Sequence, residues 1–203
     1  MKILCVSDFH SRDELIDAAI KEANSGEYDL FLSGGDFVKE EDYEKLLNNV
    51  EIPMFAAVGN WDFDFTPPKN EEFENLFRYM KVEFGEYRIV VIGSVFPEDY
   101  KKDVQEWLSG EDGRKTIFLS HYPPDRLGDA TRSGNRAGMP GFRKLILKEK
   151  PAAWFTGHIH EDFGHFHLMD TEVFNCSAVE TGKGFAVELG EDGVKDYEEV
   201  ELV

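Results

Sequence analysis

Seven side chains of the kinds that bind metal ions occur in six short segments of this chain. They are Asp8, His10, Asp36, Asn60, His121, His158 and His160. Most of the segments come directly after a run of apolar residues, where a buried strand would end. Two carboxylates, one carboxamide and four imidazoles are more ligands than a single cation needs. The pattern therefore predicts a centre for two divalent cations that share Asp36, a type of centre that metal-dependent hydrolases use.

Alternating strands and helices would position these side chains. Apolar runs at 2–7, 28–33 and 53–58 predict strands of a sheet covered on both faces. Apolar residues at three-to-four spacing predict a helix through 15–23, and a second helix is expected at 40–49. The ligands then lie at the carboxyl ends of strands, where α/β folds place their sites.

The rest of the chain continues this pattern and then ends in β structure. We expect a proline-containing loop and a short helix within 64–80, a hairpin of 82–84 with 87–93, helices at 99–109 and 141–149, strands at 115–120 and 152–156, and several strands in 163–203. Residues 121–138 show no periodicity and form the longest predicted loop. The expected fold is one α/β sandwich domain spanning residues 1–203.

Local spacing indicates how the ligands could converge. Asp8 and His10 flank one residue, and so do His158 and His160, so the two-residue period of a strand would point each pair to one side. Gly34 and Gly35 would let the backbone turn sharply and bring the next residue, Asp36, inward.

Composition limits the classes of partner. The chain has 41 acidic against 22 basic residues and a formal net charge of −19. Such a surface repels long nucleic acids and anionic membranes, although a metal site would still attract a small phosphate. Cys5 and Cys176 have no neighbouring cysteine and are expected to be reduced and apolar in role. Without a leader pattern or a membrane-length apolar run, we expect a soluble, cytoplasmic protein.

The ordered segments resemble the blocks of the calcineurin-like metallophosphoesterase superfamily, which read DxH, GD, GNH(D/E), H and GHxH. The resemblance extends from Asp8 to residues 173–175 and is greatest for the small prokaryotic phosphodiesterase branch. It implies two mixed sheets packed as a sandwich with helices outside. It also implies one metal held by Asp8, His10, Asp36 and His160, and another held by Asp36, Asn60, His121 and His158. The metals would be Mn, Fe, Zn, Ni or Co, and a bridging hydroxide would attack phosphorus.

The third block departs from the family pattern. The chain has Trp61 where the family usually has a histidine that protonates the leaving oxygen, and Asp62, which orients that histidine in the family, loses this partner. An indole N–H can donate a hydrogen bond but cannot transfer a proton near neutral pH. Trp61 is therefore either an apolar lid at the pocket edge or a hydrogen-bond donor to the substrate. The residues assigned to catalysis are Asp36, Asn60, Trp61 and Asp62.

Other polar residues have weaker assignments. Arg126, Arg132 and Arg136 could clamp a substrate phosphate or be surface residues. His165 and His167 share one face of a strand, which we expect to be exposed. Asn175 is expected to lie behind the metal ligands.

The predicted activity is hydrolysis of a small phosphoester, with phosphodiesters favoured because their cleavage should suffer least from the missing acid. A phosphomonoesterase or protein phosphatase, and a non-catalytic metal-binding scaffold of the same fold, remain as alternatives. The oligomeric state is open and includes a homo-oligomer.

Overall fold

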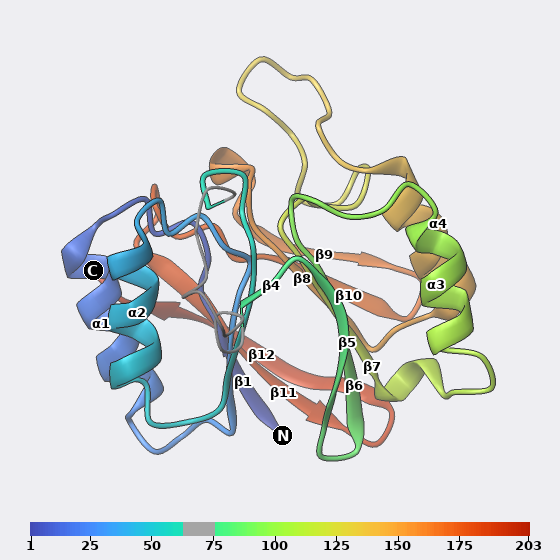
Figure 1. Ribbon diagram of the computed structural model, residues 1–203, viewed down its shortest axis with the longest axis horizontal. Helices are drawn as coiled ribbons and strands as arrows, with labels where there is room; N and C mark the ends of the chain where they lie inside the picture. The colour runs from blue at the N-terminus through green and yellow to red at the C-terminus, as the bar shows by residue number, and fades with distance from the viewer. Residues whose placement is uncertain (63–75) are drawn as a thin grey trace, which may run out of the picture.

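A computed structural model describes residues 1–62 and 76–203 as two six-stranded mixed β-sheets (Figure 1). The first sheet has the strand order β12 (Gly193–Glu201), β11 (Lys183–Gly190), β1 (Lys2–Cys5), β2 (Leu30–Ser33), β3 (Met54–Ala57) and β4 (Leu76–Phe77). The second has the order β5 (Tyr79–Phe84), β6 (Tyr87–Ile92), β7 (Thr116–Ser120), β8 (Ala153–Thr156), β10 (Thr171–Asn175) and β9 (Gly164–Leu168).

Parallel strands form the middle of each sheet. In the first sheet, β1, β2, β3 and β4 are parallel, and β11 joins β1 in the antiparallel sense. In the second, β6, β7, β8 and β10 are parallel, with β5 and β9 antiparallel at the edges. All residues of β2, β7 and β8 are buried, as expected for strands covered on both faces.

Within residues 1–62 and 76–203, four helices cover the outer faces of the two sheets. The first sheet carries α1 (Asp13–Ala23) and α2 (Glu40–Asn49), and the second carries α3 (Tyr100–Trp107) and α4 (Pro140–Glu149) (Figure 1). Short 3₁₀ turns occur at Gly113–Lys115 (η1) and His160–Asp162 (η2). One apolar cluster lies between the sheets. A second lies between the first sheet and its helices, and a third lies between the second sheet and its helices. The predicted sandwich with helices outside is confirmed.

One local prediction is wrong where it can be examined. Of the loop and short helix expected within 64–80, residues 64–75 lie outside the described residues, and 76–80 belong mainly to β4 and β5. Residues 79–84 pair with 87–92 across a turn at Gly85 and Glu86, so the predicted hairpin is confirmed and begins earlier. Cross-strand pairing with the apolar β6 outweighs local helix propensity here.

Two further observations concern the cysteines and the helices. Cys5 and Cys176 are buried and free, as predicted. Among the described residues, no helix combines the length and apolar character needed to cross a membrane.

Candidate metal centre

The predicted ligands meet at the seam between the two sheets. Asp8, Asp36 and Asn60 follow β1, β2 and β3 of the first sheet. His121 and His158 follow β7 and β8 of the second. The two sheets are joined at this point by a short parallel bridge between Ser7 and Ser177. Each sheet therefore supplies part of one site at the carboxyl ends of its parallel strands.

Four of the ligands form a cluster suited to one cation. Asp8, His10, Asp36 and His160 each offer a ligand atom, and these atoms lie within 4.8 Å of one another. The Nε2 atoms of His10 and His160 are 3.1 Å apart. His160 Nε2 is 3.4 Å from Asp8 Oδ1, and His10 Nε2 is 3.5 Å from Asp36 Oδ2. Carboxylate and imidazole donors in this arrangement fit a first-row divalent metal.

The other three ligands lie on the opposite side of Asp36. His121 Nε2 is 2.6 Å from Asn60 Oδ1, 3.2 Å from His158 Nδ1 and 3.7 Å from Asp36 Oδ1. The other nitrogen of His121, Nδ1, is 2.9 Å from the Gly34 carbonyl oxygen. Both nitrogens thus face oxygen acceptors, but an imidazole that coordinates a metal through one nitrogen carries an N–H only on the other. A cation between Nε2 and Asn60 Oδ1 would satisfy the contact that lacks a proton, so this group also fits a metal.

The backbone at the site is held in an unusual conformation. Asp8, His10, Asp36 and His158 have φ angles of 59°, 46°, 60° and 73°, in the left-handed region that non-glycine residues seldom adopt. The prediction that strand periodicity aligns Asp8 with His10 is therefore wrong in its reason, because β1 ends at Cys5. Hydrogen bonds between neighbouring loops fix these residues instead: Asp8 N donates to Gly35 O at 2.9 Å, and His10 N donates to Asp36 O at 3.0 Å.

Two glycines allow the carboxylates to sit against the backbone. A Cβ on Gly157 would lie 2.2 Å from Asp8 Oδ2, and a Cβ on Gly59 would lie 2.1 Å from Asp36 Oδ1. Both positions therefore require glycine for close approach rather than for a positive φ angle. The backbone N–H of His158 donates to both Asp8 oxygens at 3.1 Å.

The local environment sets the charge of the ligands. Burial, followed by the neighbouring His121, lowers the pKa of His158 to about 4, which keeps this imidazole neutral and able to coordinate. A hydrogen bond to Asp8 raises the pKa of His160. Burial opposes ionisation of Asp36, but its contacts with His10 and His121 outweigh burial and lower its pKa. Ionised Asp36 and neutral His158 are therefore ready to bind a cation, whereas a cation at His160 must displace the proton that the raised pKa favours.

Asp62 has a role that the sequence did not reveal. It is fully buried, and its two oxygens accept four backbone N–H bonds. The donors are Asp36 at 2.7 Å, Phe37 at 2.8 Å, Val38 at 3.0 Å and Gly59 at 2.9 Å. Burial raises its pKa, and the N–H bonds from Val38 and Gly59 oppose the rise. Without a histidine to orient, Asp62 joins the Asp36 loop to the Asn60 loop.

Trp61 lies at the outer edge of the centre. Its backbone N–H donates to Asp36 Oδ1 at 2.9 Å, while its side chain is 58% exposed. The indole meets the His10 ring edge-on, with centroids 6.1 Å apart and planes at 73°. Trp61 is therefore beside the cluster but does not cover it.

The three arginines of the long loop have partners other than the centre. Arg136 Nη1 donates to the buried carboxylate of Asp129 at 2.7 Å, and Arg132 pairs with Glu180. The Arg126 side chain is exposed, and its nearest carboxylate is Asp125 at 3.8 Å. Asp129 also accepts hydrogen bonds from the backbone N–H groups of Arg126 and Gly138, so it organises this loop. No pattern in the sequence predicts this role.

The remaining candidates separate clearly. Asn175 is buried and donates to the carbonyls of Gly128 and Ile159, so it lies directly behind the backbone between His158 and His160. His165 is half-buried, stacks on Tyr197 and bonds Glu172 at 2.5 Å, whereas His167 is exposed. The exposed face predicted for these two histidines thus holds for His167 alone.

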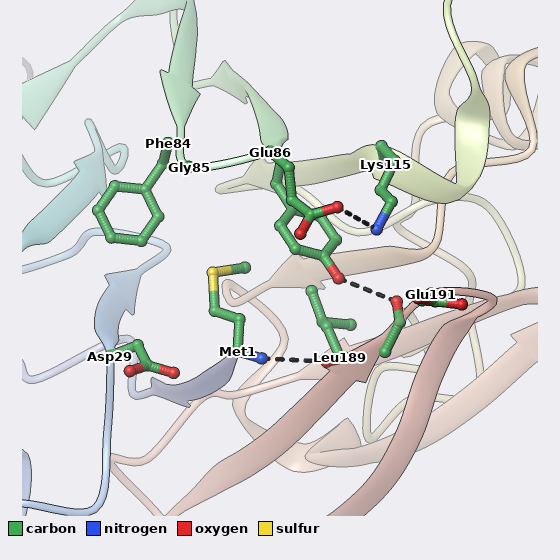
Figure 2. A pocket seen from close by; sticks show the side chains of 10 residues that line it. Met1, Asp29, Phe84, Gly85, Glu86, Lys115, Leu189 and Glu191 are labelled. Carbon is green, nitrogen blue, oxygen red and sulfur yellow. Dashed lines mark hydrogen bonds and ion pairs between the residues drawn. The ribbon is translucent and has the colours of Figure 1, made fainter.

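A hollow of about 500 Å³ lies at the other end of β1, away from the ligands. Figure 2 shows it beside the amino group of Met1, which donates to Leu189 O at 3.1 Å, and the ion pair of Lys115 with Glu86. None of the seven predicted ligands lines it. The predicted ligands converge at the seam instead.

Comparisons with known proteins agree with this arrangement. A sequence model of the calcineurin-like phosphoesterase family matches residues 1–162. No curated protein sequence matches the chain.

Solved structures share the fold at low sequence identity. A dimetal phosphatase from Danio rerio is 11% identical, with a TM-score of 0.67 and coverage of 100% of this chain and 99% of that one. A novel archaeal phosphodiesterase is 18% identical, with a TM-score of 0.59 and coverage of 98% and 99%. Vacuolar protein sorting 29 from Cryptosporidium parvum is 14% identical, with a TM-score of 0.55 and coverage of 98% and 97%. Since the family match covers most of the chain and includes the ligand-bearing strand ends, the protein belongs to the calcineurin-like phosphoesterase family.

Proposed function

We propose that this metal-dependent phosphoesterase uses two divalent cations and prefers phosphodiesters. The observation that carries the proposal is the position of Asp36, whose Oδ2 faces His10 at 3.5 Å while its Oδ1 faces His121 at 3.7 Å. One carboxylate thus lies between two groups of ligands. Such a carboxylate is suited to bridging two cations.

The chain's residues divide into two ligand sets. Asp8, His10, Asp36 and His160 would hold one cation, and Asp36, Asn60, His121 and His158 the other. Nitrogen and oxygen ligands without thiolate suit Mn, Fe, Zn, Ni or Co. Bound together, the cations would activate water and neutralise charge that develops on the phosphoryl oxygens. Asp62 and Asn175 keep the ligand-bearing loops in place.

The preference for phosphodiesters rests on Trp61. The indole at this position cannot protonate a leaving oxygen near neutral pH. Loss of a general acid typically reduces rate by about 10²–10⁴-fold, and the penalty is least when the leaving group is already stable. A diester with a good leaving group suits this site better than a monoester with a poor one. The archaeal relative described above is a phosphodiesterase, in agreement with this preference.

A small substrate also fits the charge of the protein. The net charge of −19 opposes association with long nucleic acids or anionic membranes. The proposal also includes a cytoplasmic location and no membrane partner. It is compatible with a monomer or a homo-oligomer.

A metal analysis combined with a substrate panel tests the proposal. The protein is dialysed against chelator, titrated with Mn²⁺ or Ni²⁺ in a calorimeter, and assayed with bis-p-nitrophenyl phosphate, p-nitrophenyl phosphate and cyclic nucleotides. We expect two metals per chain and faster cleavage of the diester than of the monoester. Faster cleavage of the monoester would favour a phosphatase. Failure to cleave any substrate with any metal would favour a non-catalytic metal-binding scaffold of the same fold.

A further inference from the structure

Trp61 is held at its backbone, while more than half of its side chain is exposed. Its N–H donates to Asp36 Oδ1 at 2.9 Å, and the next residue, Asp62, is buried with four backbone bonds. The turn that carries the indole is therefore rigid. The side chain is 58% exposed, so the indole does not pack into the core and remains available for contact with a ligand.

The exposed indole is next to the metal cluster rather than elsewhere on the surface. Its ring centroid is 6.1 Å from that of His10, one of the four residues of the metal cluster. Scattered exposed apolar residues need no explanation, but a rigid aromatic ring beside a catalytic centre presents a flat face to whatever binds there.

A second exposed apolar residue comes from a loop bonded to the same turn. Ser94 Oγ donates to Gly59 O at 2.8 Å, and Ser94 N donates to Val58 O at 2.7 Å. The following residue, Val95, is 51% exposed. By contrast, Arg132 and Arg136 of the long loop are paired with Glu180 and Asp129. Among the described residues, this edge of the centre therefore offers the apolar surface of Trp61 and Val95, while Arg132 and Arg136 are already paired.

We propose that Trp61 is a stacking platform for a planar aromatic group of the substrate, such as a nucleobase or an aryl ring attached to the phosphoester. The proposal rests on the phosphoesterase function above and narrows its substrate class. Stacking is the interaction that an indole provides best, since every nucleobase has a π-face. The acidic surface disfavours a long strand, so the expected ligand is a single nucleotide unit or a small aryl ester.

Matched ligand pairs test the platform without relying on turnover. Isothermal titration of the Mn²⁺-loaded protein compares AMP with ribose 5-phosphate, and phenylphosphonate with methylphosphonate. In wild type we expect the aromatic member of a pair to bind about 10- to 100-fold more tightly. Trp61→Ala should abolish this difference without weakening ribose 5-phosphate or methylphosphonate. Trp61→Phe should retain part of it.

The control removes an exposed apolar side chain far from the centre. Met169→Ala, in the turn between β10 and β9, changes a residue that is 56% exposed and should leave both affinity ratios unchanged. Thermal unfolding of each variant checks that the fold is intact. A difference confined to the AMP pair assigns nucleotides, and one confined to the phosphonate pair assigns small aryl esters; either supports the platform.

The platform is overturned if the paired ligands bind equally to wild type, if neither member of either pair binds, or if Trp61→Ala keeps the full difference. Its failure is separable from failure of the proposed function. Cleavage of bis-p-nitrophenyl phosphate without an aromatic preference refutes only the platform. An aromatic preference without cleavage of any ester refutes only the phosphoesterase function.

Discussion

The floor and the rim of the centre are constructed in opposite ways. The floor, meaning the seven ligands, is closely packed: Asp8 and His121 are fully buried, and Asp36 is nearly so. The rim, meaning Trp61 and the loop 122–138, presents an exposed indole and arginines, of which Arg132 and Arg136 pair with Glu180 and Asp129. The ligand atoms converge on the floor, whereas the rim combines an exposed aromatic ring with exposed polar side chains.

This difference separates two tasks. Left-handed backbone at Asp8 and Asp36 and close-approach glycines place strain at the floor, which fits a site that must hold charged groups in one arrangement. The contacts of Asp129 organise the rim loop, and the exposed indole of Trp61 would select substrates by packing. The floor should therefore respond to mutation in metal affinity and rate, and the rim in substrate preference.

The largest expected effect is at Asp36. Asp36→Asn preserves shape but removes the charge that lies between the two ligand groups, so we expect kcat with bis-p-nitrophenyl phosphate to fall by about 10³-fold, equivalent to several kcal/mol of metal-supplied stabilisation. Metal content measured on the same samples should fall as well. Asp170→Asn, at an exposed turn, is the control. Near-normal rate in Asp36→Asn would mean that this carboxylate does not act at the metals.

A smaller loss is expected at Asp62. Asp62→Asn replaces one acceptor oxygen with a donor, which would face backbone N–H groups. We expect metal affinity to fall about 10- to 100-fold, as for residues that orient ligands, and the free energy of unfolding to fall by about 1–3 kcal/mol. Calorimetric metal titration and denaturant unfolding measure the two effects. If Asp62→Asn lowers the free energy of unfolding but leaves the metal affinity unchanged, Asp62 has a structural role only.

Acidification should distinguish buried from exposed imidazoles in the chelated protein. Burial lowers the pKa of His158 from its ordinary value of 6.5 to about 4 in the folded chain. The unfolded chain therefore takes up the proton first, and stability is lost as the pH falls from 6.5 towards 4, by on the order of 2–3 kcal/mol.

The comparison of variants isolates this effect from His160, whose raised pKa acts in the opposite direction. Between pH 7 and pH 4.5, the free energy of unfolding of His158→Asn should fall less steeply than that of the wild type. Urea unfolding at each pH measures this free energy. His167→Asn, at an exposed position, should follow the wild-type curve. Parallel curves for all three proteins would contradict the assignment.

The smallest effect on activity is expected at the rim arginines. Arg136→Ala removes a partner of the buried Asp129, so Tm should fall slightly while KM stays unchanged. Arg126→Ala, which alters an exposed side chain, should change neither. A clear rise in KM for Arg136→Ala would show that the rim does bind phosphate and would blur the contrast with the floor.

Much of the floor could be predicted from the sequence, because most of its ligands follow apolar runs that predict buried strands. Apolar runs predicted β2, β7 and β8, and the polar residues after them gave Asp36, His121 and His158. Asn175 could also be placed, because it is the last residue of the largely buried β10. These inferences need only the rule that parallel strands gather their carboxyl ends at one edge.

What could not be predicted depends on contacts between distant segments. Asp62 bonds to residues 24 to 26 positions earlier, and Asp129 reaches Arg136 across its own loop. The left-handed conformation of Asp8 also comes from such contacts, so reasoning from strand period gave the right neighbours for the wrong reason. No local pattern in the sequence encodes a partner at that separation.

The seam position of the centre has a consequence for how the chain matures. His10 and His160 face each other at 3.1 Å although 150 positions separate them in sequence. Contacts of such long range form slowly during folding. During synthesis, the first-sheet ligands emerge well before their partners and must wait for β8. Metal binding should therefore be a late event in folding. The rate at which the refolding chain takes up a cation would report when the two sheets dock.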